Sequence, residues 1–263
     1  MELTTLFGML MALLGLLGGM YFKGVPFSAL GNPAAIFIIL VGTVGAVLNA
    51  FPMSDAKNIP RLFKIIFLNQ KTPYSNEEVI TLLSDYSQLA RKEGMLVLEN
   101  KRKEVLDPFL ARGIGMITIG QSSEIVEDTL IEDIEAMEAR HQANAQVFSQ
   151  AGTYAPTLGV LGAVIGLIAA LANMDDQVAL GHAISAAFIA TVYGIFTGYV
   201  LWHPFANKLK RKSKEEALNK RIIVEGLMLI QEGLPPNLLK EKLTAFLSQE
   251  DRTKKFPDVA NQS

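Results

Sequence analysis

Four long stretches of the chain consist of hydrophobic, small and uncharged polar residues and contain no Asp, Glu, Lys or Arg. These stretches are residues 3–22, 24–54, 141–174 and 177–207. A helix needs about 20 mostly apolar residues to cross the hydrocarbon core of a membrane. Each stretch holds a segment of about that length, so the pattern predicts four transmembrane helices. Their predicted bounds are 3–22, 33–51, 154–174 and 184–202.

A different pattern, typical of water-exposed helices, occupies the segment between the second and third spans. Ser75 and Glu78 have the spacing of a capping box, in which each side chain binds the backbone of the other residue at the start of a helix. We expect this helix to run to about Glu93. Gly94 should weaken or bend it, and a second helical piece is predicted over 95–103.

Two further helices are predicted to extend beyond the membrane. From Ser123 onward, apolar residues recur on one helical stripe, at Val126, Leu130, Ile134 and Met137. No Gly or Pro interrupts residues 124–151, so this helix can continue into the third span. The fourth span can likewise continue through 208–231 and end at the Gly-Leu-Pro-Pro run of 233–236.

These elements predict an all-α integral membrane protein. It has four transmembrane helices, a helical domain between helices 2 and 3, and long helices that extend out of the bilayer. The expected division of the chain is into two spans (1–51), a helical domain (52–150), two more spans (151–204) and C-terminal helices with a tail (205–263).

The positions of the basic residues predict the orientation in the membrane. If both termini and residues 52–150 lie on one side, that side holds 23 of the 24 Lys and Arg residues, and the short turns on the other side hold only Lys23. By the positive-inside rule, the termini and the large helical domain are cytoplasmic. We therefore expect a multi-pass protein of the cytoplasmic membrane.

Composition and motifs exclude several classes of function. The chain has no cysteine, which excludes a disulfide framework and Cys-based zinc sites. The histidines, His141, His182 and His203, lack the spacing of metal ligands, and no Walker A, HExxH or GxSxG motif is present. We therefore expect no enzyme activity, metal or cofactor. The formal net charge of −2 gives no reason to expect a nucleic-acid partner.

The spans lack the group that ion-coupled membrane proteins normally carry. Hydroxyl side chains gather in the third and fourth spans, at Thr153, Thr157, Ser185, Thr191 and Thr197. Each alone is more typical of a side chain that bonds its own backbone, but together they suggest a polar seam. No carboxylate or histidine lies at membrane depth to bind a proton. If the chain takes part in ion transport, another membrane polypeptide must supply that carboxylate.

Small residues and two prolines mark the same two spans. The glycines are Gly159, Gly162 and Gly166 in the third span and Gly194 and Gly198 in the fourth. They let helix backbones approach closely, within one subunit or between subunits. Pro156 and Pro204, near the cytoplasmic ends of these spans, each remove a backbone donor. They are either ordinary helix punctuation or a hinge that couples the spans to the cytoplasmic helices.

Residues 151–168 (AGTYAPTLGVLGAVIGLI), 191–194 (TVYG) and 202–205 (WHPF) resemble the MotA/PomA group of flagellar stator subunits, whose wider relatives are ExbB and TolQ. The resemblance covers nearly the whole chain, and the four predicted spans fit this group better than the three-span ExbB and TolQ proteins. It implies a ring, a pentamer, around two copies of a MotB-type B subunit. That partner supplies the intramembrane aspartate and a peptidoglycan anchor, and ion flow turns the rotor through its protein FliG.

The resemblance also implies roles for single residues. It matches Arg91 and Glu99 to the rotor-facing charges, Pro156 and Pro204 to the functional prolines, and Thr191 to the threonine that faces the partner's aspartate. Thr157, Ala163 and Tyr193 complete the expected ion pathway. Without the resemblance, Arg91 and Glu99 would be interpreted as ordinary solvated charges.

Two residues bear on the choice of ion. Sodium-type members carry a threonine in the third-span Gly-x-x-x-Gly run, but residues 162–166 read GAVIG. Ala163 offers no side-chain oxygen to replace the hydration shell of sodium, which favours protons. Tyr193 instead resembles the sodium type, so a sodium-driven subunit of the PomA type is the alternative. A self-contained transporter, disfavoured by the uncharged spans, and a non-conducting scaffold are the remaining alternatives.

Overall fold

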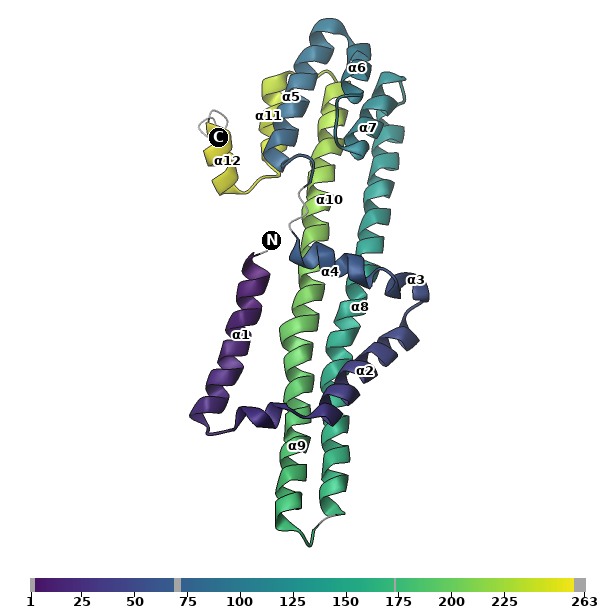
Figure 1. The fold of residues 1–263 in the computed structure, drawn as a ribbon. Helices are drawn as coiled ribbons and strands as arrows, with labels where there is room; N and C mark the ends of the chain where they lie inside the picture. Colours follow the sequence, from purple (N-terminus) through teal and green to yellow (C-terminus); the bar gives the residue numbers. More distant parts are fainter. Residues whose placement is uncertain (1–2, 69–71, 173, 258–263) are drawn as a thin grey trace. The chain divides into compact units, whose positions relative to one another are not determined.

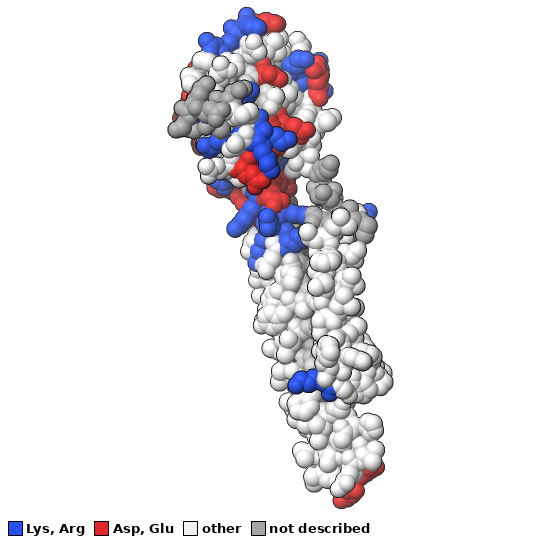
Figure 2. Space-filling model, turned by 90° about the vertical axis from the view of Figure 1, so that its left-hand side faces the viewer, with Lys and Arg blue, Asp and Glu red and all other residues white. Residues whose placement is uncertain are grey.

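The computed structural model describes residues 3–68, 72–172 and 174–257 (Figure 1). Every regular element within these ranges is helical, which confirms the predicted all-α fold. The chain forms two compact units. We call residues 1–70 with 141–211 the membrane unit, and residues 71–140 with 212–263 the charged unit. On the face drawn in Figure 2, acidic and basic side chains gather over the charged unit, and the membrane unit is mostly free of them.

The membrane unit contains the predicted spans. The described residues include four helices long and apolar enough to cross a membrane: Leu3–Phe22, Phe27–Ala50, Ser123–Leu171 and Gln177–Gln231. The first is α1 (Leu3–Phe22), and the second joins the short η1 (Phe27–Leu30) to α2 (Pro33–Ala50). Asn32 caps α2 by accepting a hydrogen bond from the Ala35 amide at 3.2 Å, and Pro33 follows at the first helical position.

The other two spans belong to much longer helices. α8 (Ser123–Leu171) has 49 residues. A continuous run of 55 residues contains α9 (Gln177–Phe196), η3 (Thr197–Trp202) and α10 (His203–Gln231). At 1.5 Å per residue each is roughly 70–80 Å long, more than twice the thickness of a hydrocarbon core. Both helices must therefore continue outside the membrane, as the sequence predicted.

Spans three and four approach each other closely through small residues. A Cβ built on Gly159 would lie 2.9 Å from the Ala190 carbonyl oxygen, and one on Gly194 would lie 2.7 Å from the Ala155 carbonyl oxygen. Since real Cβ atoms do not approach backbone so closely, only glycine fits at these positions. The predicted close approach is confirmed within a single chain, between α8 and α9.

Two short helices follow α2 in the membrane unit, α3 (Met53–Ala56) and α4 (Ile59–Phe67). α4 buries Leu62 and Ile66 in an apolar cluster with residues of α8 and α10. Five aromatic side chains form its centre, with ring centroids of neighbouring members 5.3–6.5 Å apart: Phe63, Phe67, Phe148, Trp202 and Phe205. Ring pairs at these distances contribute attraction beyond the area they bury.

The charged unit is built from short helices around parts of α8 and α10. The short helices are α5 (Asn76–Glu93), η2 (Met95–Val97), α6 (Leu98–Arg102), α7 (Pro108–Thr118), α11 (Pro236–Thr244) and α12 (Gln249–Lys255). The predicted capping box at the start of α5 is confirmed. The Ser75 hydroxyl accepts from the Glu78 amide at 3.3 Å, and the Glu78 carboxylate accepts from the Ser75 amide at 2.7 Å. Gly94, with φ of 89°, ends α5 in a conformation that favours glycine.

Aliphatic side chains form the core of this unit. The predicted stripe of α8 faces it: Val126, Leu130 and Ile134 are fully buried, and Met137 is nearly so. α10 contributes Ile222, Ile223 and Leu227 to the same core. One end of α8 and one end of α10 belong to each unit. No single boundary along the chain therefore separates the membrane unit from the charged unit.

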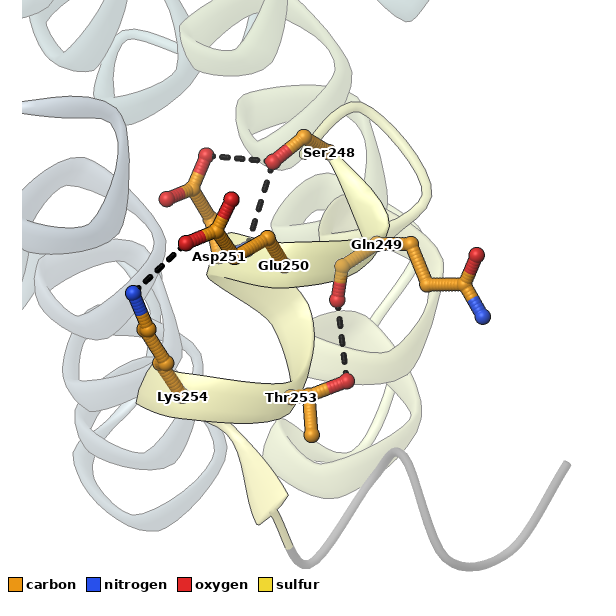
Figure 3. Close-up of polar contacts among 6 residues, drawn as sticks. All are labelled: Ser248, Gln249, Glu250, Asp251, Thr253 and Lys254. Atoms are coloured by element: carbon orange, nitrogen blue, oxygen red, sulfur yellow. Dashed lines mark hydrogen bonds and ion pairs between the residues drawn. The ribbon is translucent and has the colours of Figure 1, made fainter.

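Several polar contacts lie within α12 and its N-cap residue (Figure 3). The Ser248 hydroxyl accepts from the Asp251 amide at 3.2 Å and donates to the Asp251 carboxylate at 2.6 Å. Lys254 pairs with Glu250 at 2.6 Å, one helical turn away. Phe256, which follows the helix, is buried in the core of the charged unit and attaches α12 to it.

Candidate functional site

Pro156 lies inside α8 without ending the helix. Proline cannot donate a backbone hydrogen bond, and in a regular helix its ring crowds the carbonyl four residues earlier. Here that carbonyl belongs to Gly152, and both groups face Gly198 of η3. A Cβ on Gly198 would lie 2.8 Å from Pro156 Cδ and 2.8 Å from the Gly152 carbonyl oxygen. Glycine at 198 therefore leaves the space that the proline ring requires.

The stretch of π-helix η3 ends at Trp202, two residues before Pro204. A π-turn replaces i→i+4 hydrogen bonds by i→i+5 bonds, and it accommodates a proline that would otherwise remove a helical bond and collide with the preceding turn. Next to this proline, the His203 ring packs on Gly152, where a Cβ would come within 2.8 Å of the ring. Gly152 is thus in contact with His203, the residue before Pro204, and it precedes Pro156 by one helical turn. Both prolines therefore lie next to the contact between α8 and η3.

Ala163 and Thr191 lie beside the contact between the spans. Their neighbours Gly162 and Ala190 meet directly: a Cβ on Gly162 would lie 3.1 Å from Ala190 Cβ. A step of one residue rotates a helical side chain by about 100°. Because α8 and α9 are antiparallel, the two steps turn Ala163 and Thr191 toward the same side of the helix pair. Both are half-buried.

The hydroxyl groups of Thr157 and Thr197 bond their own helix. Thr157 is exposed and donates to the Tyr154 carbonyl oxygen at 2.7 Å. Thr197 donates to the Tyr193 carbonyl oxygen at 2.8 Å. These bonds use each hydroxyl hydrogen but leave its oxygen able to accept or to coordinate. Thr157 lies on a different face of α8 from the glycines, because it is rotated by about 200° around the helix axis from Gly159. The structure therefore does not group Thr157 with Thr191.

Tyr193 points to the connection between the first two spans, where its hydroxyl donates to the Leu30 carbonyl oxygen. Asn32 adds a second link, since its amide nitrogen donates to the Ala186 carbonyl oxygen at 3.2 Å. Together they tie the α1–α2 connection to α9. The resemblance places Tyr193 in the expected ion pathway but gives no role to Asn32, whose only sequence signal is its N-cap position before Pro33.

The predicted rotor-facing charges lie on either side of the Gly94 turn. Arg91 is exposed in the last turn of α5 and makes no ion pair with the described residues. Glu99 is held in place: its carboxylate accepts from Arg102 Nη1 at 2.9 Å and from the Thr118 hydroxyl of α7 at 3.0 Å. An ion pair this exposed contributes about 0–1 kcal/mol, so its main effect is to fix the direction of Glu99.

The same turn exposes an apolar side chain. Leu96 lies in η2 with 74% of its surface exposed, between Arg91 and Glu99 along the chain. We call these three residues the α5–α6 surface. The resemblance implied a role for its two charges and none for Leu96. A leucine in a predicted helical piece is normally a core residue, and no sequence signal distinguished this one.

The described residues contain no group of three or more His, Asp or Glu side chains that could hold a metal ion. In the charged unit, burial is the main cause that raises the pKa of Tyr86 to about 12, with smaller contributions from nearby Tyr74, Glu104 and Asp85. Tyr86 is therefore neutral under ordinary conditions and belongs to the core.

Known proteins resemble this chain over almost its whole length. Residues 101–222 match the profile of the MotA/TolQ/ExbB proton channel family. Motility protein A of Bacillus subtilis is 54% identical over 254 residues, which cover 97% of this chain and 94% of that protein. The structure of the flagellar MotAB stator complex from Bacillus subtilis matches with a TM-score of 0.89 and 55% identity, covering 95% of this chain and 97% of that one. Chemotaxis protein PomA of Vibrio alginolyticus is 30% identical over 249 residues, 92% of this chain and 97% of that protein.

Proposed function

The chain belongs to the MotA/TolQ/ExbB proton channel family, and we propose that it works as the A subunit of a flagellar stator. The observation that carries this proposal is the match of nearly the whole chain, in sequence and in fold, to motility protein A and the MotAB stator complex. The subunit is a motor and channel component and not an enzyme.

The uncharged spans require a partner for ion transport. A MotB-type B subunit supplies the carboxylate that binds the ion at membrane depth, and several copies of this chain, five by resemblance, surround it. The side of the α8–α9 pair that carries Ala163 and Thr191 faces the partner, because these are the positions beside the glycine contact where a side chain has room. The solved MotAB stator complex of a similar chain supports the presence of a B-subunit partner.

Protons are the proposed coupling ion. Ala163 provides no side-chain oxygen for a sodium ion, whereas a proton needs only the carboxylate and a path of water. Tyr193 resembles the residue of the sodium type, but its hydroxyl donates a hydrogen bond to the Leu30 carbonyl oxygen. The sodium-driven PomA-type alternative also has less support from sequence identity. The chain is 30% identical to chemotaxis protein PomA and 54% identical to motility protein A of Bacillus subtilis.

Coupling to rotation uses the two prolines and the α5–α6 surface. Protonation of the partner's carboxylate changes the charge between the spans, and the α8–η3 contact at Pro156 and Pro204 transmits the resulting shift as a hinge. Residues 52–150 then form the rotor-interacting domain. Arg91 and Glu99 dock on FliG by charge complementarity, which sets register more than affinity. This orientation places both termini in the cytoplasm, consistent with the distribution of Lys and Arg.

Ion conduction and swimming test the proposal. Cells that express this chain together with its B subunit should show proton leak when the channel is open, and cells that express the chain alone should show none. Swimming should continue unchanged in sodium-free medium and stop when a protonophore is added. Ion flux from the chain alone would contradict the motor assignment and support a self-contained transporter. Swimming that depends on sodium and survives the protonophore would refute the ion assignment alone.

A further inference from the structure

α4 of the membrane unit has two unlike faces. Leu62 and Ile66 are 4% and 0% exposed, and they pack against Phe148 of α8 and against Phe205 and Leu209 of α10. Arg61 and Lys64 are exposed, three residues apart on a helix, and Lys57 is exposed just before it. This division into an apolar and a basic side is the pattern of a helix that lies in the plane of a membrane interface.

Contacts with the spans place α4 at the level where the spans end. Met9 of α1 packs on the same cluster, and one turn earlier Thr5 accepts a hydrogen bond from Lys208, which lies just past the fourth span. The Phe63 ring of α4 lies 6.5 Å from that of Trp202, the last residue of the predicted fourth span. Tryptophan is enriched at the boundary between lipid and water. In Figure 1, α4 runs across α8 and α10, whereas α1 runs roughly along their direction.

The basic side of α4 lacks compensating acids. Among the described residues, Lys57, Arg61 and Lys64 form no ion pair, and the single acid within residues 51–68 is Asp55. The Asp55 carboxylate accepts a hydrogen bond from the neighbouring Ser54 hydroxyl at 3.2 Å. Three cations at one level of the interface match the phosphate groups of a lipid surface. A guanidinium can bind a phosphate through two parallel hydrogen bonds, and an ammonium acts as a point charge.

We propose that α4 is an interfacial helix whose Lys57, Arg61 and Lys64 bind the headgroups of anionic phospholipids in the cytoplasmic leaflet. The proposal rests on the orientation given under the proposed function, since it places α4 on the side that carries the anionic lipid. The bound headgroups hold α4 at the interface. Through Phe63 and Phe67, α4 then braces Phe205, the residue that follows Pro204.

Lipid retention by the purified protein tests the proposal. The full chain, purified with its B subunit, is placed in nanodiscs of phosphatidylcholine with or without phosphatidylglycerol. After mild detergent extraction, the lipids that remain bound are counted by mass spectrometry. We expect the wild type to retain phosphatidylglycerol in preference to phosphatidylcholine. Each charge near the surface contributes about fivefold in affinity, so the triple variant K57Q/R61Q/K64Q should lose at least tenfold of this preference. Added salt should weaken retention by the wild type.

Two further variants control the experiment. K92Q/K103Q/K242Q removes three exposed lysines from the charged unit and should retain lipid as the wild type does. K57R/R61K/K64R keeps all three charges and should retain the preference. It also separates charge from folding if the neutral triple variant assembles poorly. A wild type without preference for phosphatidylglycerol would overturn the proposal, and so would undiminished retention by an assembled neutral variant.

A third outcome identifies a different occupant. If the neutral variant breaks up the oligomer while the wild type shows no lipid preference, α4 binds a neighbouring subunit and the lipid proposal is wrong. Lipid retention is measured without ion flux or rotation. Failure of the lipid proposal is therefore distinguishable from failure of the stator assignment, which conduction with and without the B subunit tests separately.

Discussion

Glycines of the membrane unit and glycines of the charged unit are surrounded by different atoms. In the membrane unit, a Cβ on Gly194 would lie 2.7 Å from the Ala155 carbonyl oxygen and 2.8 Å from Gly159 Cα, both backbone atoms. In the charged unit, a Cβ on Gly226 would lie 2.5 Å from Leu83 Cδ1, and one on Gly113 would lie 2.3 Å from Leu227 Cδ1. These are ends of flexible side chains, which can move to admit a methyl group.

The difference reflects the solvent around each unit. Helices in a lipid bilayer gain little by burying apolar side chains from other hydrocarbon, so they associate through close backbone contact between small residues. The charged unit faces water and gains about 25 cal/mol for each Å² of apolar surface buried, so leucine and isoleucine fill its core. We therefore expect the two units to respond differently to the same substitution.

The largest effect should come from Gly194→Ala. The new methyl group meets backbone on the opposite helix, so α8 and α9 must separate, at a cost of about 1–3 kcal/mol or more. Assembly with the B subunit, and hence every activity, should fall sharply. Gly226→Ala should cost less, because Leu83 can adopt another rotamer. Gly45→Ala, where a Cβ meets nothing within 4 Å in this chain, is the matched control. Thermal unfolding of the purified complexes measures all three. Equal losses of thermal stability for Gly194→Ala and Gly226→Ala would contradict the proposed difference between the two units.

Pro156→Ala should abolish rotation and leave insertion and assembly intact. The substitution restores a backbone donor and removes the ring that fits against Gly198, so α8 becomes a regular helix and loses the proposed hinge. Rotation of tethered cells and the amount of complex in the membrane are the two measurements. Pro33→Ala, at the first helical position of α2, removes a proline from a site with no proposed movement and should rotate normally. Normal swimming by Pro156→Ala cells would remove the hinge from the mechanism.

Arg91→Glu should reduce rotation without affecting the membrane unit. It reverses a charge on the α5–α6 surface, and an opposite charge change on the rotor protein should restore part of the speed. Lys92→Glu makes the same change at the adjacent exposed position and serves as the control. Swimming speed and complex yield are measured in all strains. A full-speed Arg91→Glu strain would exclude Arg91 from the rotor contact.

The smallest effect should be a loss of stability of the charged unit at high pH. Burial raises the pKa of Tyr86 from 10.0 to about 12, so the folded state favours the neutral phenol. Stability is therefore fully present below pH 10 and is lost as the pH rises from 10 toward 12. Urea unfolding followed by circular dichroism should show this loss in the wild type, and Tyr86→Phe should lessen it. Trp202, the single tryptophan, reports the membrane unit in the same samples. An equal loss in the phenylalanine variant would assign the effect to other groups.

Most of the architecture could be predicted because it depends on local patterns. Uncharged runs gave the spans, the Ser75–Glu78 spacing gave the start of α5, and the absence of Gly and Pro over 124–151 indicated that α8 is continuous. Each signal lies within a few turns of the structure that it predicts. The apolar stripe of α8 was predictable for the same reason, since helical periodicity alone places Val126, Leu130 and Ile134 on one face.

Details of the candidate site depend on residues far apart in the sequence and could not be predicted. The bond from Tyr193 to Leu30 joins positions 163 residues apart, and Asn32 meets Ala186 across a similar separation. Thr118 fixes Glu99 from another helix. The π-helical stretch before Pro204 was also missed, because proline signals a disturbance but not how the helix accommodates it. The roles of Thr157, Ala163 and Thr191 stay predictions.

The way in which α10 completes the charged unit has a consequence for synthesis of the protein. Ile222, Ile223 and Leu227 fill a core whose other walls include α5 and α7, and α7 ends at Thr118. Roughly 100 residues must be translated in between, which takes on the order of 5–20 s at the usual rate. During that time two more spans must enter the bilayer, and the parts of the core that α10 covers stay exposed. Newborn chains are thus most exposed to aggregation and proteolysis in this interval, which ends when Ile222, Ile223 and Leu227 of α10 have been translated and pack into the core.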